Sequence, residues 1–454
     1  MPIEQIAGDI LQAVGGTPLV RLGRMARGLK AEILLKVEGM NPGGSIKDRA
    51  ALRMVETAER RGLLRPGGTI IEATAGNTGV GLALVAAVRG YRCIFVLPDK
   101  MSSEKVALLR AYGAEVVITP TAVAPDSPES YNGVAERLTR EIEGAYRPAQ
   151  FENEENPEAH YASTGPEIWA QVGGRLDVLV AGMGTGGTIS GTGRFLKEKD
   201  PDIRVIGADP EGSILSGDSP KPWKVEGIGE DFVPRTFDRQ VVDEMIRIGD
   251  REAFAVARRL AREEGVLAGG SSGTALAAAL RYAQRATRPL RIVVILPDTG
   301  RNYITKFYSD DWLTTNGLWE GERGASLTVG EAAARRRKAP GLVSVGPDEH
   351  LEEAFRKMDE FGISQVPVIE NGESVGNVAE AGLMRLVFDG VDFSAQRVRG
   401  VMGRPLPGLD VDTDLSEAYR LLLAGNSAIL VLKGGKPVQV LSRFDLLDFR
   451  RKGE

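Results

Sequence analysis

The stretch LDVLVAGMGTGGTISGTGRF, residues 176–195, sets the fold class, because an apolar run passes through a glycine-rich turn directly into a helical pattern. The run is apolar almost throughout, which is typical of a strand that is covered on both faces. Backbone N–H groups at the start of the following helix can bind an anion. We therefore expect a strand, an anion-binding turn and a helix in succession.

The same succession recurs along the chain up to about residue 310. Short β-rich runs alternate with helical patterns such as GVGLALVAAVRG and SSEKVALLRAYGA; the runs are TIIEA, RCIFVLP, AEVVIT, RVIGADP and RIVVILPD. This alternation predicts an α/β domain with a mainly parallel sheet. Such sheets bind ligands at the carboxyl ends of their strands.

The composition limits the classes of partner. The 454 residues exceed what one hydrophobic core usually serves, so we expect at least two domains. Acidic residues number 62 against 57 basic ones, without a long block of one sign, which disfavours a nucleic-acid or membrane partner. The single cysteine, Cys93, and the lack of a signal-like N-terminus or a membrane-length apolar run predict a soluble cytoplasmic protein.

The chain repeats itself after residue 341. When the two copies are aligned, Leu351 lies opposite Leu415 and Ala354 opposite Ala418. Each copy has the pattern strand, helix, strand, turn, strand, helix, which predicts one small α+β domain of paired modules. We therefore expect domains at 1–315 and 342–454, joined by a polar, glycine-containing linker at 316–341.

Two ligands fit the glycine-rich turn of the opening stretch. Gly182-x-Gly184-x-x-Gly187 follows a strand, and Asp209 ends the next one, as in sites that bind NAD. The dense glycine and threonine of GTGGT also fit a single phosphate group held at a helix start. This turn by itself does not choose between an NAD-dependent oxidoreductase and a phosphate-binding enzyme of another class.

The segment GGSSG, residues 269–273, matches the Gly-x-Ser-x-Gly turn of α/β-hydrolases, with Ser271 as the nucleophile. A hydrolase triad of this order needs a histidine after the serine, and His350 in the repeated tail is the only one. The hydrolase interpretation is therefore disfavoured. A helix-capping serine that also contacts a ligand fits the segment better.

Two further loops favour a particular cofactor. In NPGGSIKDRA, residues 41–50, Lys47 falls in the first helical turn, where the helix dipole disfavours a cation by roughly 0.3–1 kcal/mol. In EATAGNTGVG, residues 72–81, hydroxyls and backbone donors at a helix start suit a carboxylate or a phosphate. A lysine bound as a Schiff base is not a free ammonium ion, and desolvation lowers its pKa when it is released. Together the loops predict a phosphorylated aldehyde cofactor attached to Lys47.

At this point the sequence resembles a known family. The segments NPGGSIKDR, EATAGNTGVGLALVAAVRGYRCIFVLPDKMSSEKVALLRAYGAEVV, GTGGT, DPEGSI, VEGIGEDFVP, GGSSGT and ILPDTGRNYITKFYSDDW resemble the cystathionine β-synthase family. These are pyridoxal-phosphate enzymes of fold type II in the cysteine-synthase superfamily. The resemblance implies an α/β catalytic region of two subdomains with mainly parallel sheets, and a tail similar to their paired CBS domain.

The resemblance also assigns roles to residues. Lys47 matches the lysine that binds the cofactor and moves the Cα proton of the substrate, and Ser271 matches the partner of the pyridine nitrogen. A neutral serine there implies a weaker electron sink, which favours β-elimination over transamination. The phosphate contacts are Gly184, Thr185, Gly186, Gly187 and Thr188. Asn77 matches the residue that bonds the ring hydroxyl. The substrate-binding positions are Thr74, Gly76, Asn77, Thr78, Gln150, Tyr161, Gly227 and Gly229.

The implied reaction condenses L-serine with L-homocysteine to cystathionine and water. A cysteine synthase that uses O-acetylserine and sulfide shares most of this machinery, and a catalytically inactive sensor of an adenosyl ligand is a further alternative. Glu230 stands where animal members carry an aromatic residue, which affects the choice of the second substrate. Because the chain starts almost at the fold and Cys93 lies in a strand pattern, we expect no haem, and we expect no metal.

The tail implies a regulatory ligand. Ser442 and Asp445 match the hydroxyl and carboxylate that hold an adenosine ribose in CBS modules, whereas Ala379 and Gly382 at the equivalent positions of the first copy cannot do so. S-adenosylmethionine or an adenosine nucleotide is the ligand that the resemblance implies, and a purely structural tail is the alternative. By analogy with the family we expect a homodimer or a larger homo-oligomer.

Overall fold

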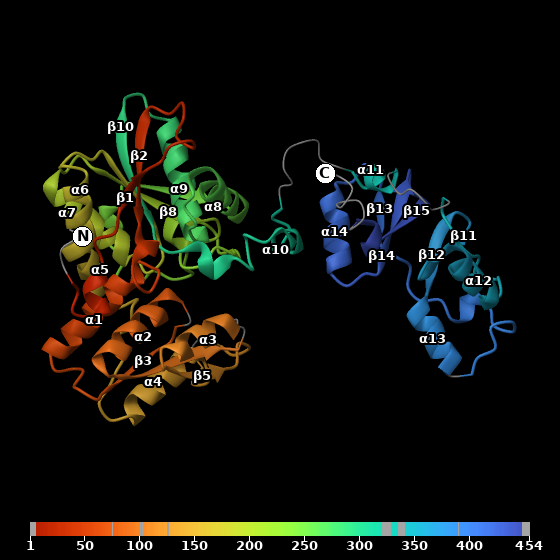
Figure 1. Ribbon diagram of the computed structural model, residues 1–454, viewed down its shortest axis with the longest axis horizontal. Helices are drawn as coiled ribbons and strands as arrows, with labels where there is room; N and C mark the ends of the chain where they lie inside the picture. Colours follow the sequence, from red (N-terminus) through yellow and green to blue (C-terminus); the bar gives the residue numbers. More distant parts are fainter. Residues whose placement is uncertain are drawn as a thin grey trace. The chain divides into compact units, whose positions relative to one another are not determined.

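The computed structural model of the chain describes residues 6–74, 76–99, 101, 103–124, 127–319, 328–334, 341–388 and 390–446. It divides into two compact units, an N-terminal unit of Met1–Tyr308 and a C-terminal unit of Ser309–Glu454. The elements of each unit can be followed by colour in Figure 1.

The larger sheet of the N-terminal unit has six strands in the order β1-β2-β10-β7-β8-β9. All neighbours are parallel except β1 and β2, which pair antiparallel at one edge. The strands are β1 (Leu19–Arg21), β2 (Ala31–Val37), β7 (Val178–Gly182), β8 (Arg204–Pro210), β9 (Glu244–Ile248) and β10 (Leu290–Leu296). The central strands are buried along almost their whole length because helices cover both faces, which confirms the parallel sheet that their apolar runs predict.

A smaller sheet of four parallel strands has the order β5-β4-β3-β6. Its strands are β3 (Thr69–Glu72), β4 (Arg92–Pro98), β5 (Glu115–Thr119) and β6 (Ala145–Tyr146), and its helices are α2 (Asn77–Arg89), α3 (Ser103–Ala111) and α4 (Tyr131–Glu141). Figure 1 shows these elements grouped together, apart from β2 and β10 of the larger sheet. Each sheet has its own hydrophobic core, so the two subdomains expected from the resemblance are confirmed.

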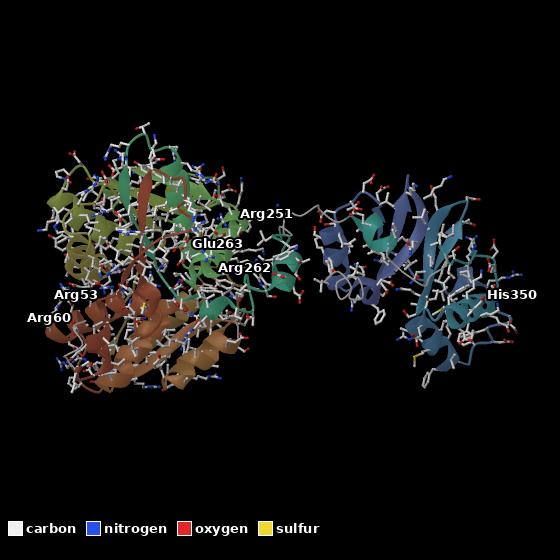
Figure 2. The ribbon with its side chains drawn as sticks, turned by 45° about the horizontal axis from the view of Figure 1, so that its top comes forward. Arg53, Arg60, Arg251, Arg262, Glu263 and His350 are labelled. Carbon is white, nitrogen blue, oxygen red and sulfur yellow. The ribbon has the colours of Figure 1, made fainter. Side chains whose placement is uncertain are left out.

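The remaining helices of the N-terminal unit accompany the larger sheet or join the two sheets. They are α1 (Lys47–Arg60), α5 (Glu155–Ala159), a π-helical segment (His160–Thr164), α6 (Gly165–Gln171), α7 (Gly187–Lys199), α8 (Asp250–Glu264) and α9 (Gly270–Gln284). Short 3-10 turns lie at Ile10–Ala13, Glu38–Met40, Ile214–Ser216, Arg239–Val241 and Gly300–Tyr303. Charges of both signs, such as Arg251, Arg262 and Glu263 of α8, stand on the surface (Figure 2). The surface therefore mixes charges as the composition does.

The C-terminal unit contains the predicted repeat. The first copy has α12 (Leu351–Phe361), β11 (Gln365–Glu370), β12 (Glu373–Ala379) and α13 (Glu380–Phe388), and a short 3-10 turn follows at Val398–Gly400. The second copy has β13 (Gly408–Asp410), α14 (Leu415–Leu423), β14 (Ala428–Lys433) and β15 (Lys436–Ser442). Leu351, Ala354, Leu415 and Ala418 are all buried, as their alignment predicts. In the first copy the opening strand is reduced to a single parallel bridge between Val345 and Val368.

The predicted linker needs a correction. Of residues 316–341, those at 320–327 and 335–340 lie outside the described residues. Between them α11 (Val329–Ala334) packs into the core of the second copy, because Val329, Ala332 and Ala333 form one apolar helix face. The boundary between compact units also falls after Tyr308, which leaves α10 (Asp310–Thr315) in the C-terminal unit.

Two features are absent from the described ranges, a membrane-spanning helix and a group of metal-binding side chains. Every helix in them is too short or too polar to span a lipid bilayer. Nor do three or more histidine, cysteine, aspartate or glutamate side chains gather there in a way that could hold a metal ion. In parallel α/β sheets, ligands bind at the carboxyl ends of the strands, where the following helices begin.

Candidate active site

Lys47 is the first residue of α1, and backbone contacts fix this helix start to the end of β10. The amide of Ile46 donates to the carbonyl of Pro297 at 2.8 Å, and Ser45 forms an isolated bridge with Asp298. The Lys47 amide donates to Ser45 Oγ at 3.2 Å. The fold thus brings this amine to the carboxyl end of a parallel sheet.

The surroundings of the Lys47 amine favour its neutral form. Burial lowers the pKa of Lys47, although the carboxyl groups of Glu230 and Asp298 act in the opposite direction. The positive end of the α1 dipole further disfavours an ammonium ion. A neutral amine is a nucleophile and a proton acceptor, so this position suits covalent and acid–base chemistry.

The turn Gly184–Thr188 joins β7 to α7, and hydrogen bonds from Asn156 and Thr236 hold it in place. Gly186 has a φ of 79°, a left-handed conformation that favours glycine. The hydroxyl of Thr185 accepts a hydrogen bond from Asn156 Nδ2 at 3.0 Å, and its carbonyl accepts one from the Thr236 hydroxyl at 2.5 Å. The Gly187 amide donates to the Thr185 hydroxyl at 3.3 Å. The next amides of α7 have no acceptors within the helix, so the turn offers donors to an anion.

The glycines of this turn leave no room for side chains. A Cβ atom on Gly187 would lie 2.2 Å from Asn156 Oδ1, and one on Gly186 would lie 2.4 Å from the Cβ of Phe237. Only glycine therefore lets the backbone donors face a ligand at this close range. The residues present fit the phosphate group of a cofactor.

The loop that contains Gly227 and Gly229 packs directly against this turn. The Gly229 amide donates to the carbonyl of Met183 at 2.7 Å, and a Cβ on Gly184 would lie 2.7 Å from the Gly227 carbonyl oxygen. The next residue, Glu230, is partly buried, and its carboxyl has a pKa of about 7, raised by burial and by Asp231 and Asp209 although Lys47 opposes the shift. The loop therefore brings a readily protonated carboxyl toward Lys47.

The loop from Thr74 to Thr78 begins α2 at the carboxyl end of β3. Gly76 precedes the helix, and its amide donates to the Thr74 hydroxyl at 3.3 Å; Ala75 lies outside the described residues. The Thr78 hydroxyl donates to Gln150 Oε1 at 2.5 Å. The structure therefore brings the predicted carboxylate-binding residues together at one helix start.

Asn77 is held by a residue that the sequence analysis missed. Asp298 Oδ2 accepts hydrogen bonds from Asn77 Nδ2 at 2.9 Å and from the Tyr303 hydroxyl at 2.6 Å. Burial raises the pKa of Asp298 to about 6, while the bonds from Tyr303 and Asn77 oppose the shift. Asp298 lies two residues after the end of β10, so its position at the carboxyl end of a buried strand was the signal that could have identified it.

Ser271 lies in the first turn of α9 and is buried. The N-cap of α9 is Gly269, so Ser271 is not the helix-capping residue that one interpretation expected. The Gly269 amide donates to the carbonyl of Asp298 at 3.2 Å. The neighbouring Ser272 hydroxyl has no hydrogen-bond partner within the described part of the chain. The start of α9 therefore offers buried hydroxyl groups beside the residue that positions Asn77.

Tyr161 is not brought to this cluster, which corrects its assignment as a residue near the substrate. Its hydroxyl donates to Glu198 at 2.6 Å in an exposed contact, and its ring packs against Phe195 of α7. The preceding residue, His160, points inward instead, because adjacent helical residues point in different directions. His160 is fully buried, with Nε2 3.3 Å from the Thr188 hydroxyl.

His160 contacts the phosphate turn and lies within electrostatic range of Lys47. Burial, together with the positive charges of Lys47 and Arg49, lowers the pKa of His160 well below its ordinary value. A neutral imidazole can accept or donate one hydrogen bond without adding a charge. This histidine had no role in the sequence analysis, and it lies in the π-helical segment, a local distortion that often marks functional sites.

The NAD interpretation does not fit the geometry around Asp209. This carboxylate is fully buried, and Oδ2 accepts a hydrogen bond from the Ser216 amide at 3.0 Å. The loop that follows β8 therefore binds the Asp209 carboxylate, which in an NAD site would have to contact the ribose. The hydrolase interpretation gains no support from the structure: His350 is an exposed residue at the start of α12 (Figure 2).

In the C-terminal unit the two predicted ligand groups lie together. The Ser442 hydroxyl and amide both donate to Asp445 Oδ2, at 2.6 and 2.8 Å. The Asp445 amide donates back to the Ser442 hydroxyl at 3.3 Å. The two side chains are therefore preorganised in the second copy, whereas Ala379 and Gly382 give the first copy no such pair.

Known protein-family models match both units of the chain. The model of the family described as pyridoxal-phosphate dependent enzyme matches residues 10–298, and the CBS domain model matches residues 338–389 and 398–452. These matches cover the sheet-based unit and both copies of the repeat.

Curated relatives and a solved structure are similar to the chain over long stretches. Cystathionine beta-synthase from Oryctolagus cuniculus is 45% identical over 441 residues, which cover 94% of this chain and 80% of that protein. Cysteine synthase from Staphylococcus aureus (strain N315) is 44% identical over 308 residues, 67% of this chain and 97% of that one. The structure of an O-acetylserine dependent cystathionine beta-synthase from Helicobacter pylori has a TM-score of 0.62 at 41% identity, covering 66% of this chain and 98% of that chain.

Proposed function

The chain belongs to the cystathionine beta-synthase family of pyridoxal-phosphate-dependent enzymes, and from this premise we propose that it condenses L-serine with L-homocysteine. The β-hydroxyl of serine leaves as water, and the homocysteine sulfur takes its place on Cβ to give cystathionine. The observation that carries the proposal is the Lys47 amine with its lowered pKa, placed among the starts of α1, α2, α7 and α9.

The residues of these helix starts would hold the cofactor. Pyridoxal phosphate, when bound, supplies an aldehyde carbon for covalent capture by amines and a ring that accepts electrons from the substrate. Lys47 would bind the aldehyde carbon, and the amides of Gly184–Thr188 would bind the phosphate. Asn77, held by Asp298, would donate to the ring hydroxyl, and the Ser271 hydroxyl would face the ring nitrogen.

The substrate residues orient serine for proton transfer at Cα. The Thr74–Thr78 loop and Gln150 would bind the substrate carboxylate, because the start of α2 offers backbone and hydroxyl donors to an anion. The carboxylate contacts fix where the Cα–H bond points. Lys47 Nζ then accepts the Cα proton, which its lowered pKa permits, and returns it after the thiol has added to Cβ.

A cysteine synthase reaction with O-acetylserine and sulfide is the second candidate. The similarity to the Staphylococcus aureus cysteine synthase and to the Helicobacter pylori structure supports it. The C-terminal unit favours the first candidate, because the Oryctolagus cuniculus relative extends over it while the cysteine synthase match spans only 67% of the chain.

One steady-state comparison separates the candidates. Serine and O-acetylserine are each supplied with either homocysteine or sulfide, and the amino-acid product is quantified by mass spectrometry. The proposal expects the highest kcat/KM for serine with homocysteine. A clear preference for O-acetylserine with sulfide, and little cystathionine from serine, would replace it with the second candidate.

The C-terminal unit has the role of a regulatory module in this proposal. The CBS domain match and the Ser442–Asp445 pair support an adenosine ligand, S-adenosylmethionine or an adenosine nucleotide, with its ribose at the second copy. The division into a catalytic and a regulatory part, the assembly into a homodimer or larger oligomer and the cytoplasmic location belong to the same proposal. Calorimetric titration of the full chain with these ligands tests the binding.

A further inference from the structure

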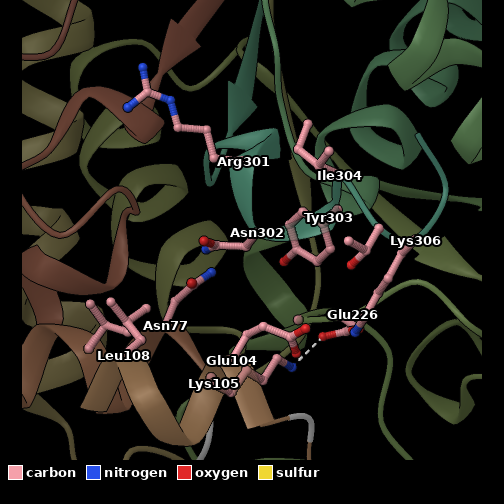
Figure 3. Close-up of a pocket in the computed structure, with 14 residues that line it drawn as sticks. Asn77, Glu104, Lys105, Leu108, Glu226, Arg301, Asn302, Tyr303, Ile304 and Lys306 are labelled. Atoms are coloured by element: carbon pink, nitrogen blue, oxygen red, sulfur yellow. Dashed lines mark hydrogen bonds and ion pairs between the residues drawn. The ribbon is translucent and has the colours of Figure 1, made fainter. Parts of the chain in front are cut away.

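A cavity of about 270 Å³ opens beside Asn77 and Gly227 in the N-terminal unit. Figure 3 shows that its wall combines side chains of α2 and α3 with those of the segment that follows β10. Its other lining residues are Gly76, Val80, Glu104, Lys105, Leu108, Glu226, Arg301, Asn302, Tyr303, Ile304, Thr305 and Lys306. Because Asn77 and Gly227 belong to the candidate active site, the cavity is continuous with that site.

A cluster of opposite charges lines this cavity. Lys105 Nζ lies 2.6 Å from Glu226 Oε2, and Lys306 contacts the other oxygen of the same carboxylate. The three side chains keep 25%, 31% and 28% of their surface exposed, for Lys105, Glu226 and Lys306 respectively. The cluster is therefore shielded but still reachable by a small ligand.

Glu226 is ionised in this cluster. Its burial acts to raise the pKa, but the charges and hydrogen bonds of Lys105 and Lys306 outweigh burial, and the pKa lies below its usual value. One carboxylate therefore faces two ammonium groups, and the cluster carries an excess positive charge. At the same cavity Arg301 adds a further cation and Glu104 a further carboxylate, so three cationic side chains face two acidic ones.

A purely structural role explains this cluster poorly. Lys105 comes from α3 beside the smaller sheet, and Lys306 follows the last strand of the larger sheet, so the contact crosses between the two subdomains. Partly exposed ion pairs contribute only about 0–1 kcal/mol to stability. Long, flexible lysine side chains are better suited to exchange one carboxylate partner for another.

The charges match the head group of an amino acid. An α-amino acid carries one carboxylate and one ammonium group, which need cations and an anion placed close together. Lys105 and Lys306 supply the cations, and Glu226 supplies the anion. Sulfide has neither group and would gain nothing from them.

We propose that Lys105, Glu226 and Lys306 form the binding site for the head group of the acceptor, an α-amino-acid thiol. The carboxylate of the acceptor replaces Glu226 as the partner of the two lysines, and the ammonium group of the acceptor binds Glu226. The thiol of the acceptor extends past Asn77 toward the reacting carbon. This inference rests on the proposed function and deepens it, because it makes an amino-acid thiol rather than sulfide the acceptor. These residues determine specificity and do not touch the bond that breaks.

The test compares two thiols in the purified holoenzyme. With saturating serine, kcat and KM are measured for homocysteine, which has the head group, and for 2-mercaptoethanol, which lacks it. Lys105→Met and Lys306→Met, on separate elements, should each raise the KM for homocysteine about tenfold, as expected for one lost charge-assisted contact. Glu226→Gln should shift the same KM in the same direction. For 2-mercaptoethanol, kcat/KM should change less than about twofold.

The matched control is Lys197→Met. Lys197 forms an ion pair of 2.8 Å with Asp243 and is 25% exposed, like Lys105, but it lies at the far end of α7 from the turn. This variant should behave as the wild type with both thiols. The inference is overturned if the cavity variants leave the homocysteine KM unchanged, or if they reduce turnover of both thiols equally. Failure of the wild type to form either thioether from serine would instead overturn the proposed function.

Discussion

The two units of the molecule assemble their proposed ligand groups in different ways. In the N-terminal unit important groups are held by residues far away in the sequence, as Asn77 is by Asp298 and Thr78 is by Gln150. In the C-terminal unit Ser442 and Asp445 are three residues apart and hold each other. The first site therefore depends on how the two subdomains pack, whereas the second follows from one local turn. Variants should affect the two sites independently.

The largest effect is expected for Lys47→Ala. Removing the amine eliminates both the covalent attachment and the proton acceptor, so kcat/KM should fall by at least about 10³-fold. The visible absorbance of the bound cofactor should be lost or displaced. Calorimetric titration should show that an adenosine ligand still binds the C-terminal unit with unchanged affinity. Turnover at the wild-type rate would exclude Lys47 as the reactive amine.

The next effect compares a glycine from each unit. Gly187→Ala places a Cβ atom 2.2 Å from Asn156 Oδ1, so the turn must open and cofactor affinity should fall about a hundredfold. Gly382→Ala is the matched control, since Gly382 lies in α13 with no atom within 4 Å of the added carbon. It should raise stability by about 0.5–1 kcal/mol and leave cofactor affinity unchanged. Equilibrium dialysis against pyridoxal phosphate and thermal melting measure both, and equal cofactor affinity in the two variants would contradict the proposed turn.

A smaller effect is expected in the C-terminal unit. Ser442→Ala removes one ribose contact and the partner that orients Asp445, so affinity for an adenosine ligand should fall about tenfold. Ala379→Ser, at the equivalent position of the first copy, should leave the affinity unchanged because Gly382 supplies no carboxylate there. Titration calorimetry on the full chain gives both values. Equal affinities for wild type and Ser442→Ala would place the ligand elsewhere.

The smallest effect concerns the pH dependence of stability. Burial raises the pKa of Glu230 to about 7 in the folded state, so between about pH 4.5 and 7 the native carboxyl keeps a proton that the unfolded chain has released. Because the unfolded state then binds fewer protons, this group lowers stability as the pH rises through that window. Glu230→Gln should therefore stabilise the protein at pH 8 by on the order of 1 kcal/mol, and much less at pH 5.

Melting temperatures at the two pH values check this sign, with the exposed Glu373→Gln in the C-terminal unit as the control. A gain from Glu230→Gln that is equal at pH 5 and pH 8 would show that titration of Glu230 is not its cause.

Most of the fold was predictable because its signals are local. The apolar runs of β3, β4, β7, β8 and β10 are buried where the pattern places them, whereas β5, at an edge of the smaller sheet, stays partly exposed. The position of Lys47 at the start of α1 follows from the Pro-Gly-Gly turn before it. The helix α11 was missed, because its apolar face is short and is recognised only when it packs into the core of the second copy of the repeat.

The site was predictable only in part. Tyr161 was expected near the substrate, and the structure turns it toward Glu198 and its neighbour His160 inward, because a linear motif does not give the direction of a side chain on a helix. Asp298 was overlooked because its role depends on Asn77, which lies 221 residues earlier in the chain. The cluster of Lys105, Glu226 and Lys306 likewise has no signature in any single segment.

The sequence by itself determined the parallel α/β architecture and the repeated tail, and it located Lys47 and the glycine turn at helix starts. These depend on the alternation of apolar runs and on backbone conformations that neighbouring residues set. Only the tertiary structure decided which carboxyl groups face Lys47, which residue holds Asn77 and which charges line the adjoining cavity. Burial and electrostatic interaction depend on distance in space, and distance in space between remote segments is fixed only when the two sheets pack together.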